Sequence, residues 1–171
     1  MKLPLPTAAL LLGIGGLIPF AACGFFAVAT VEPIATTWLL ALVFYGAVIL
    51  SFLGGVQWGL ALSDARTDLA PGSDRAGLDR LRFGLGVVPS LIGWGAAFAT
   101  MAMGPEVALA ILIGGFAATL ITETRLHRRA LLPSGYLWLR WGLSLAVIAV
   151  LVAVLVLRLM DAHIGAGQTA G

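Results

Sequence analysis

A small set of polar residues inside or beside long apolar stretches carries the chemical interest of this 171-residue chain. The set consists of Gln57, Arg82, Glu123, Tyr136 and Arg140. A charged side chain at membrane depth is costly, so it pairs with another group, faces water or marks a functional site. The sequence therefore predicts that Glu123 has a partner, for which Arg140, Arg82 and Arg125 are the candidates.

Two interpretations of this polar cluster remain open. In the first, it is a structural clamp that holds helices together by charge-assisted hydrogen bonds. In the second, it is a pocket for a lipid headgroup or a quinone ring, with Trp58 and Trp138 as walls. Trp, Tyr and Arg are common anchors at membrane interfaces, which favours the clamp.

Other chemistries find little support in the residues. Cys23 is the single cysteine, and His127 and His163 lie outside the apolar stretches, so the sequence predicts no metal site and no cofactor. We find no nucleophile beside a base and no phosphate-binding loop. An enzyme is therefore the less favoured class, although a membrane enzyme is not ruled out.

Composition defines the class of protein. Hydrophobic residues make up 60% of the chain and charged residues only 11%, whereas soluble domains carry about 25% charged residues. This indicates a polytopic membrane protein surrounded by lipids. The net charge of +2 is too small to indicate nucleic-acid binding.

Five stretches are long enough to cross a bilayer as helices, which takes about 20 apolar residues each. We predict an all-α, five-helix bundle forming one domain over residues 1–160, and a flexible tail over 161–171. The first helix is interpreted as retained, not cleaved as a signal peptide. The predicted helices cover residues 8–30, 36–62, 83–103, 106–124 and 136–160.

Basic residues predict the orientation. With the N-terminus inside, nine of the ten Lys and Arg residues lie on the cytoplasmic side and only Arg158 lies outside. This asymmetry predicts an N-inside, C-outside topology. The charged connection over 63–82 is interpreted as a solvated loop, with an amphipathic turn over 73–82 as the alternative.

The stretch over 41–63 is the predicted central helix. Small residues recur on it at four-residue spacing, which lets neighbouring helices approach closely. Those predicted to pack are Ala47, Ser51, Gly55 and Gly59, and on the fourth helix Gly114 and Ala118. Gly46, Gly54 and Gln57 lie on another face, so we expect neighbours on two sides.

Four strings carry a resemblance to a known family: GLIPF (16–20), FLGGVQWGLAL (52–62), GVVPSLIGW (86–94) and LLPSGYLWLR (131–140). They resemble a family of small bacterial inner-membrane proteins of unknown function related to mitochondrial transmembrane protein 69. The chain departs from that family's pattern at Glu123, where the family has Asp, and at Gly135, where it has an aromatic residue. The resemblance implies a multi-pass protein of the bacterial inner membrane and implies no reaction.

The favoured hypothesis is a non-enzymatic accessory or assembly subunit of a larger respiratory or photosynthetic membrane complex. The motive is small size, no predicted catalytic set, and an aliphatic last helix that is free to dock with other membrane subunits. The alternative is a lipid- or quinone-binding or transport module that uses the polar cluster. The sequence names no specific ligand, partner or oligomeric state.

Overall fold

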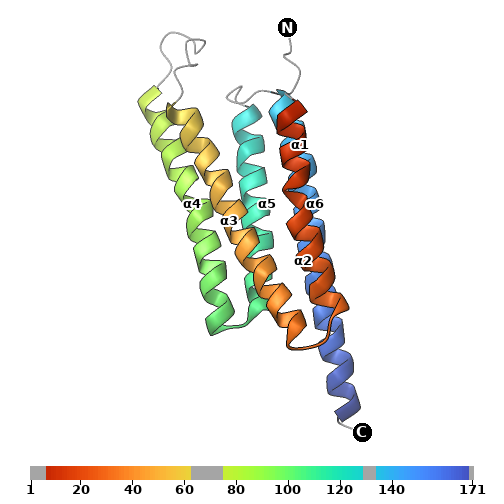
Figure 1. The fold of residues 1–171 in the computed structure, drawn as a ribbon. Coiled ribbons are helices and arrows are strands. Elements are labelled where there is room, and N and C mark those ends of the chain that lie inside the picture. Colours follow the sequence, from red (N-terminus) through yellow and green to blue (C-terminus); the bar gives the residue numbers. More distant parts are fainter. Residues whose placement is uncertain (1–6, 63–74, 129–133, 170–171) are drawn as a thin grey trace.

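The computed structural model describes residues 7–62, 75–128 and 134–169. Within these ranges the chain is helical and contains no strand, which confirms the predicted all-α class (Figure 1). The helices are α1 (Thr7–Gly15), α2 (Leu17–Ala29), α3 (Ile34–Leu62), α4 (Arg75–Ala102), α5 (Pro105–Arg128) and α6 (Ser134–Thr169).

Five helical stretches of the described chain are long and apolar enough to span a membrane, as predicted. The first of them combines α1 and α2, which are interrupted at Gly16. Pro19 has no N–H to donate to the carbonyl of Gly15, four residues earlier. Tyr45 on α3 links α3 to this interruption, because its hydroxyl donates a 2.9 Å hydrogen bond to the neighbouring carbonyl of Gly16.

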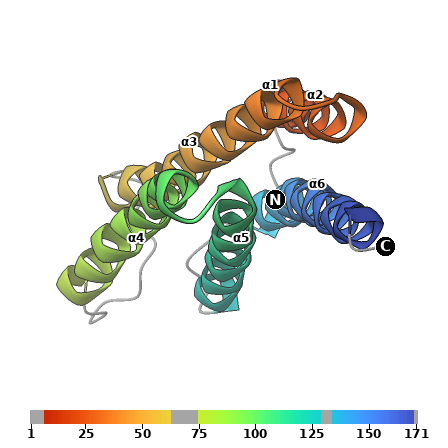
Figure 2. The same cartoon turned by 90° about the horizontal axis from the view of Figure 1, so that it is seen from below.

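The helices form two compartments that share a wall. Helix α3 contacts α2, α4 and α5, while α6 contacts α2 and α5. The result is a triangle of α3, α4 and α5 beside a ring of α2, α3, α5 and α6 (Figure 2). Large apolar side chains fill the centre, including Phe20, Phe116, Leu39, Leu50 and Leu112.

Helix α3 reaches its neighbours through glycines on more than one side, which confirms its central position. A Cβ atom at Gly54 would overlap the carbonyl oxygen of Gly86 on α4. A Cβ at Gly46 would lie 2.8 Å from the Leu112 side chain on α5. Missing side chains therefore let α3 approach both helices closely.

The predicted packing stripe on α3 is correct in its first half and wrong in its second. Ala47 and Ser51 face Gly93 of α4, where a Cβ would come within 2.8 Å of the Ala47 carbonyl oxygen. Gly55 and Gly59 have nothing within 4 Å of a built Cβ and are exposed outside the bundle.

Helix geometry explains this error. With 3.6 residues per turn, positions four apart rotate by about 40° per step, so Gly59 lies far around α3 from Ala47. The observed line alternates four- and three-residue steps and so keeps facing the same neighbour. It runs through Ala47, Ser51, Gly54 and Trp58.

On α5 the closest approach also lies one residue away from the prediction. Gly114 is exposed and has nothing within 4 Å of a built Cβ. A Cβ at Gly115 would lie 2.7 Å from Leu50 and 2.8 Å from Ile92. Ala118 is exposed as well. The packing ridge of α5 is therefore the one that contains Gly115.

Two predicted boundaries differ from the structure. Helix α4 begins at Arg75, so the described part of the charged connection continues the helix instead of forming a separate turn; residues 63–74 lie outside the described chain. Helix α6 continues to Thr169, although we predicted a flexible tail after residue 160. No proline interrupts the sequence after Asp161, so the backbone hydrogen bonding can continue.

A buried polar cluster as the candidate functional site

Polar side chains from four helices are buried at one end of the bundle. Gln57 on α3, Arg82 on α4, Glu123 on α5 and Arg140 on α6 are each less than 9% exposed. Tyr136 lies in the first turn of α6, and its side chain lies outside the described part of the chain. The four described side chains thus belong to one end of the molecule.

The centre of the cluster is an ion pair between α5 and α6. The Nε atom of Arg140 donates a 2.7 Å hydrogen bond to Oε2 of Glu123. The Nη1 atom of Arg140 donates a 3.0 Å hydrogen bond to the hydroxyl of Ser144, one turn further along α6. Of the three partners considered for Glu123, the structure therefore assigns Arg140.

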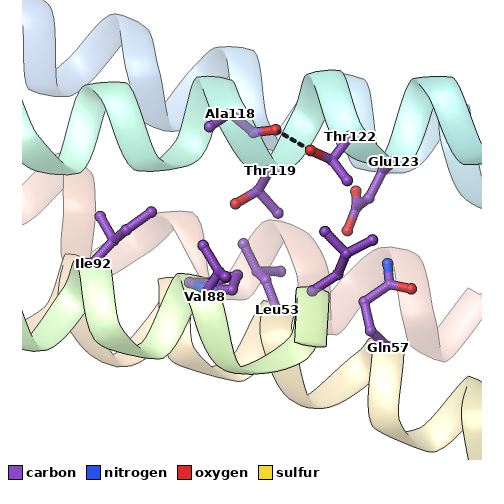
Figure 3. Close-up of a pocket in the computed structure, with 10 residues that line it drawn as sticks. Leu53, Gln57, Val88, Ile92, Ala118, Thr119, Thr122 and Glu123 are labelled. Atoms are coloured by element: carbon purple, nitrogen blue, oxygen red, sulfur yellow. Dashed lines mark hydrogen bonds between the residues drawn. The ribbon is translucent and has the colours of Figure 1, made fainter. Parts of the chain in front are cut away.

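Helix α3 adds an amide to this pair. The side chain of Gln57 points toward the Glu123 carboxylate and interacts with it (Figure 3). Arg82 is buried on α4, the fourth helix to contribute to this end.

Gln57, Glu123 and Arg140 each have one polar side-chain atom that is buried without a hydrogen-bond partner. These atoms are Oε1 of Gln57, Oε1 of Glu123 and Nη2 of Arg140. An unpaired polar atom in a buried site costs about 1–3 kcal/mol. These three side chains therefore retain two acceptors and one donor that water or a ligand would satisfy.

Two cavities lie beside the cluster, and the smaller one is inside the triangle of α3, α4 and α5. Its volume is about 50 Å³, and both Gln57 and Glu123 line it. Figure 3 shows Thr119 and Thr122 on the α5 wall, where Thr122 donates a 2.9 Å hydrogen bond to the Ala118 carbonyl. Since a water needs at least about 10–15 Å³ and polar partners, this cavity has room and acceptors for water.

A larger cavity lies inside the ring on the other side of α5. Its volume is about 150 Å³, and Arg140 and Ser144 line it together with mostly apolar residues. Phe20 and Phe116 are its aromatic walls. The ion pair therefore stands between two cavities, with Glu123 lining the smaller and Arg140 the larger.

Leu53 of α3 lines both cavities. It is buried between the triangle and the ring. The wall between the two cavities at this point is therefore one aliphatic side chain.

The two tryptophans considered as pocket walls line neither of these two cavities. Trp58 covers Gly86, and its indole N–H donates a 3.1 Å hydrogen bond to the Phe83 carbonyl. Trp138 is 80% exposed. Both indoles occupy the outer surface, as interfacial anchors do.

Sequence reasoning missed Ser144 and the two phenylalanines. Ser144 follows Arg140 by four residues, and that spacing places two side chains together on a helix. Phe116 precedes Glu123 by seven residues, which puts both on one face. These signals were present, whereas nothing in the local pattern indicated that Phe20 would reach the same cavity.

The opposite end of the bundle holds a second charge cluster that the sequence reasoning did not assemble. Arg158 on α6 lies 2.7 Å from Oε1 of Glu32 and 3.6 Å from Oε1 of Glu106. Glu32 lies in the connection between α2 and α3, and Glu106 lies in the first turn of α5. These side chains are 20%, 53% and 35% exposed, respectively.

The Glu32 carboxylate is stabilised in its charged form. Oε2 accepts hydrogen bonds from the backbone N–H and the hydroxyl of Thr36 in the first turn of α3. The Thr36 hydroxyl and the nearby Arg158 lower the pKa of Glu32 below its ordinary value of 4.5. Glu32 thus caps α3 and links it to α6.

Comparisons with known proteins agree with the resemblance inferred from the four strings. A family model described as "Protein of unknown function (DUF3429)" matches residues 5–156. Transmembrane protein 69 of Xenopus tropicalis is 38% identical over 92 residues, which cover 52% of this chain and 32% of that protein. The matched region thus spans about a third of that relative. No solved structure matches the chain.

Proposed function

Since the chain belongs to the DUF3429 family of proteins of unknown function, we propose from its structure that it is a non-enzymatic accessory or assembly subunit of a larger membrane complex. We place this complex, respiratory or photosynthetic, in the bacterial inner membrane. The observation that supports this role is the outward-facing glycine surface of α3. Gly55 and Gly59 lie four residues apart with open space beyond them, so another helix could approach there closely.

A second outward surface supports the same role. Gly142, Ala149 and Ala153 are exposed along α6. Helix α6 contacts α2 and α5 on its other side, so this surface is available within the chain as described. Small residues on a lipid-facing helix allow close backbone contact with a partner helix.

The proposed orientation follows from the basic residues. Arg80 and Arg125 are exposed near the end that holds the Arg140 cluster, whereas Arg158 lies at the other end. The positive-inside rule then puts the Arg140 end in the cytoplasm. Alkaline phosphatase fused to the C-terminus should be active if this orientation is right, and an inactive but folded fusion would contradict it.

Purification in mild detergent tests the accessory role. A tagged full-length chain should bring down a membrane protein in stoichiometric amount. Gly55→Leu combined with Gly59→Leu should reduce that recovery without lowering the level of the chain. Gly84→Leu, at an exposed α4 position with equally open space, is the matched control. A chain that migrates alone as a monomer would exclude this function.

One specific observation favours the alternative, a lipid- or quinone-binding or transport module. The unpartnered atoms of the buried cluster lie on side chains that line cavities. Glu123→Gln and Gln57→Leu should then abolish binding or transport of the lipid or quinone, while the amount of folded protein stays unchanged. Loss of the folded protein in both variants would support the structural clamp instead.

A further inference from the structure

The larger cavity has apolar walls and is also lined by Arg140, a side chain with one unsatisfied donor atom. Leu17, Phe20, Phe116 and Leu143 contribute apolar surface, while Arg140 and Ser144 contribute the polar part. The Nη2 atom of Arg140 is buried and has no partner. A ligand that fills this cavity would therefore gain one hydrogen bond by presenting an acceptor to Nη2.

The charges of the site select a neutral acceptor. Arg140 is already paired with Glu123 at 2.7 Å, so the positive charge of its guanidinium is offset. A buried anion would find no further compensation in this pair, and an uncompensated buried charge is strongly unfavourable. A carbonyl oxygen satisfies a donor without adding charge.

The size of the cavity selects a ring. An apolar cavity of about 150 Å³ is large enough to bind a benzene molecule, and the cavity here has that volume. Two aromatic side chains provide edges or faces for contact with a ring. Gly13 and Gly16 add wall positions without side chains.

The cavity also has an outlet toward the outside of the bundle. Leu12 and Phe52 line it and are 78% and 66% exposed. Both Gly13 and Arg140 lie near the start of their predicted spans, so the cavity is close to one membrane surface. A ring bound here could leave an apolar tail among the acyl chains.

We propose that this cavity binds the headgroup of an isoprenoid quinone, with one ring carbonyl accepting a hydrogen bond from Nη2 of Arg140. The ring would lie against the edge-to-face pair of Phe20 and Phe116, and its tail would leave past Leu12 and Phe52. This inference rests on the binding alternative above and names its ligand class and residues. It does not depend on whether the chain has a protein partner.

Binding to the full-length chain in lipid nanodiscs that contain no quinone tests the proposal. The probe is a ubiquinone with a decyl tail, and the comparison probe is decylbenzene, which has a ring and tail but no carbonyl. The quinone should bind at least about tenfold more tightly, because decylbenzene leaves the buried donor unsatisfied. Equal binding of the two probes overturns the proposal.

Two variants test the location. Ile49→Phe adds bulk to the cavity wall and should weaken quinone binding about tenfold or more. Ile121→Phe makes the same change at an exposed site on α5 that lines neither cavity, and should leave binding unchanged. Unchanged binding in Ile49→Phe overturns the assignment.

Two further experiments test the location even if Ile49→Phe does not fold: a third variant, and photolabelling of the chain with a reactive quinone. Arg140→Lys retains the positive charge opposite Glu123 and removes the forked donor, so it should weaken binding of the quinone but not of decylbenzene. A photoreactive azidoquinone should label peptides around Phe20 and Phe116. Labelling spread evenly over the helices would contradict the site, whatever the result of partner purification.

Discussion

The two ends of this bundle use the same pair of residue types in opposite environments. At one end Glu123 and Arg140 are 1% and 7% exposed, and at the other Glu32 and Arg158 are 53% and 20% exposed. Both pairs have a closest distance of 2.7 Å. The two ion pairs therefore have equal distances but unequal effects on stability when they are broken. A buried charge that loses its partner is not solvated by water, whereas an exposed charge is.

The largest expected effect comes from breaking the buried pair. Glu123→Leu leaves Arg140 without its counter-ion and should lower the free energy of unfolding by about 3–5 kcal/mol. Titration with SDS in mixed micelles measures this change. The double variant Glu123→Leu/Arg140→Leu should recover most of the loss, since it buries no charge. A double variant as unstable as Glu123→Leu would contradict this account.

Two adjacent glycines on α3 allow a comparison between a position that packs against a neighbouring helix and one that faces outward. Gly54→Ala places a methyl group against the Gly86 carbonyl and should cost about 1–3 kcal/mol in unfolding free energy. Gly55→Ala meets open space and should not lower the unfolding free energy; the higher helix propensity of Ala should raise it by up to about 1 kcal/mol. Unfolding of both variants in mixed micelles gives the comparison, and equal costs would refute the assigned faces.

A smaller effect is expected from breaking the exposed cluster. Arg158→Leu removes the contacts with Glu32 and Glu106, both of which water can solvate. The unfolding free energy should fall by less than about 1 kcal/mol. The difference from the wild type should shrink further at high salt, which screens exposed charges. A loss as large as that of Glu123→Leu would remove the distinction between the two ends.

The smallest expected effect is a dependence on pH at the exposed end. Since the pKa of Glu32 is lowered in the folded state, its stabilising contribution is present above its ordinary value of 4.5. That contribution is lost as the pH falls through the lowered value. Wild type should therefore be slightly more stable than Glu32→Gln at about pH 7, and this difference should shrink as the pH falls below 4.5. A difference that grows on acidification would contradict this assignment.

Sequence patterns predicted the helical spans because long apolar runs directly reflect the solvent that surrounds them. They also predicted the polar end, since Glu123 and Arg140 are costly at such depth unless they meet. The pairing partner needed tertiary geometry, because Arg82, Arg125 and Arg140 were all plausible by position. Only the arrangement of α5 beside α6 distinguishes them.

The packing faces were harder to predict than the spans. Gly54 and Gly55 are adjacent small residues, yet one meets α4 and the other faces outward. A strict four-residue repeat drifts around the helix, so it assigns Gly55 to the packing face. Alternating four- and three-residue steps assign Gly54 to that face, as observed. The role of the tryptophans was hard to predict for a different reason, since an aromatic ring near a polar cluster serves equally well as a pocket wall or as an anchor at the surface.

Leu53 is a side chain that both cavities share. Because this one side chain borders both hollows, a rotamer change that enlarges one takes space from the other. A guest on the Arg140 side that pushes Leu53 away would squeeze the water-sized hollow beside Glu123 and Gln57. A ligand bound in the cavity on one side of α5 would thus change the volume of the cavity on the other side, without any helix having to shift.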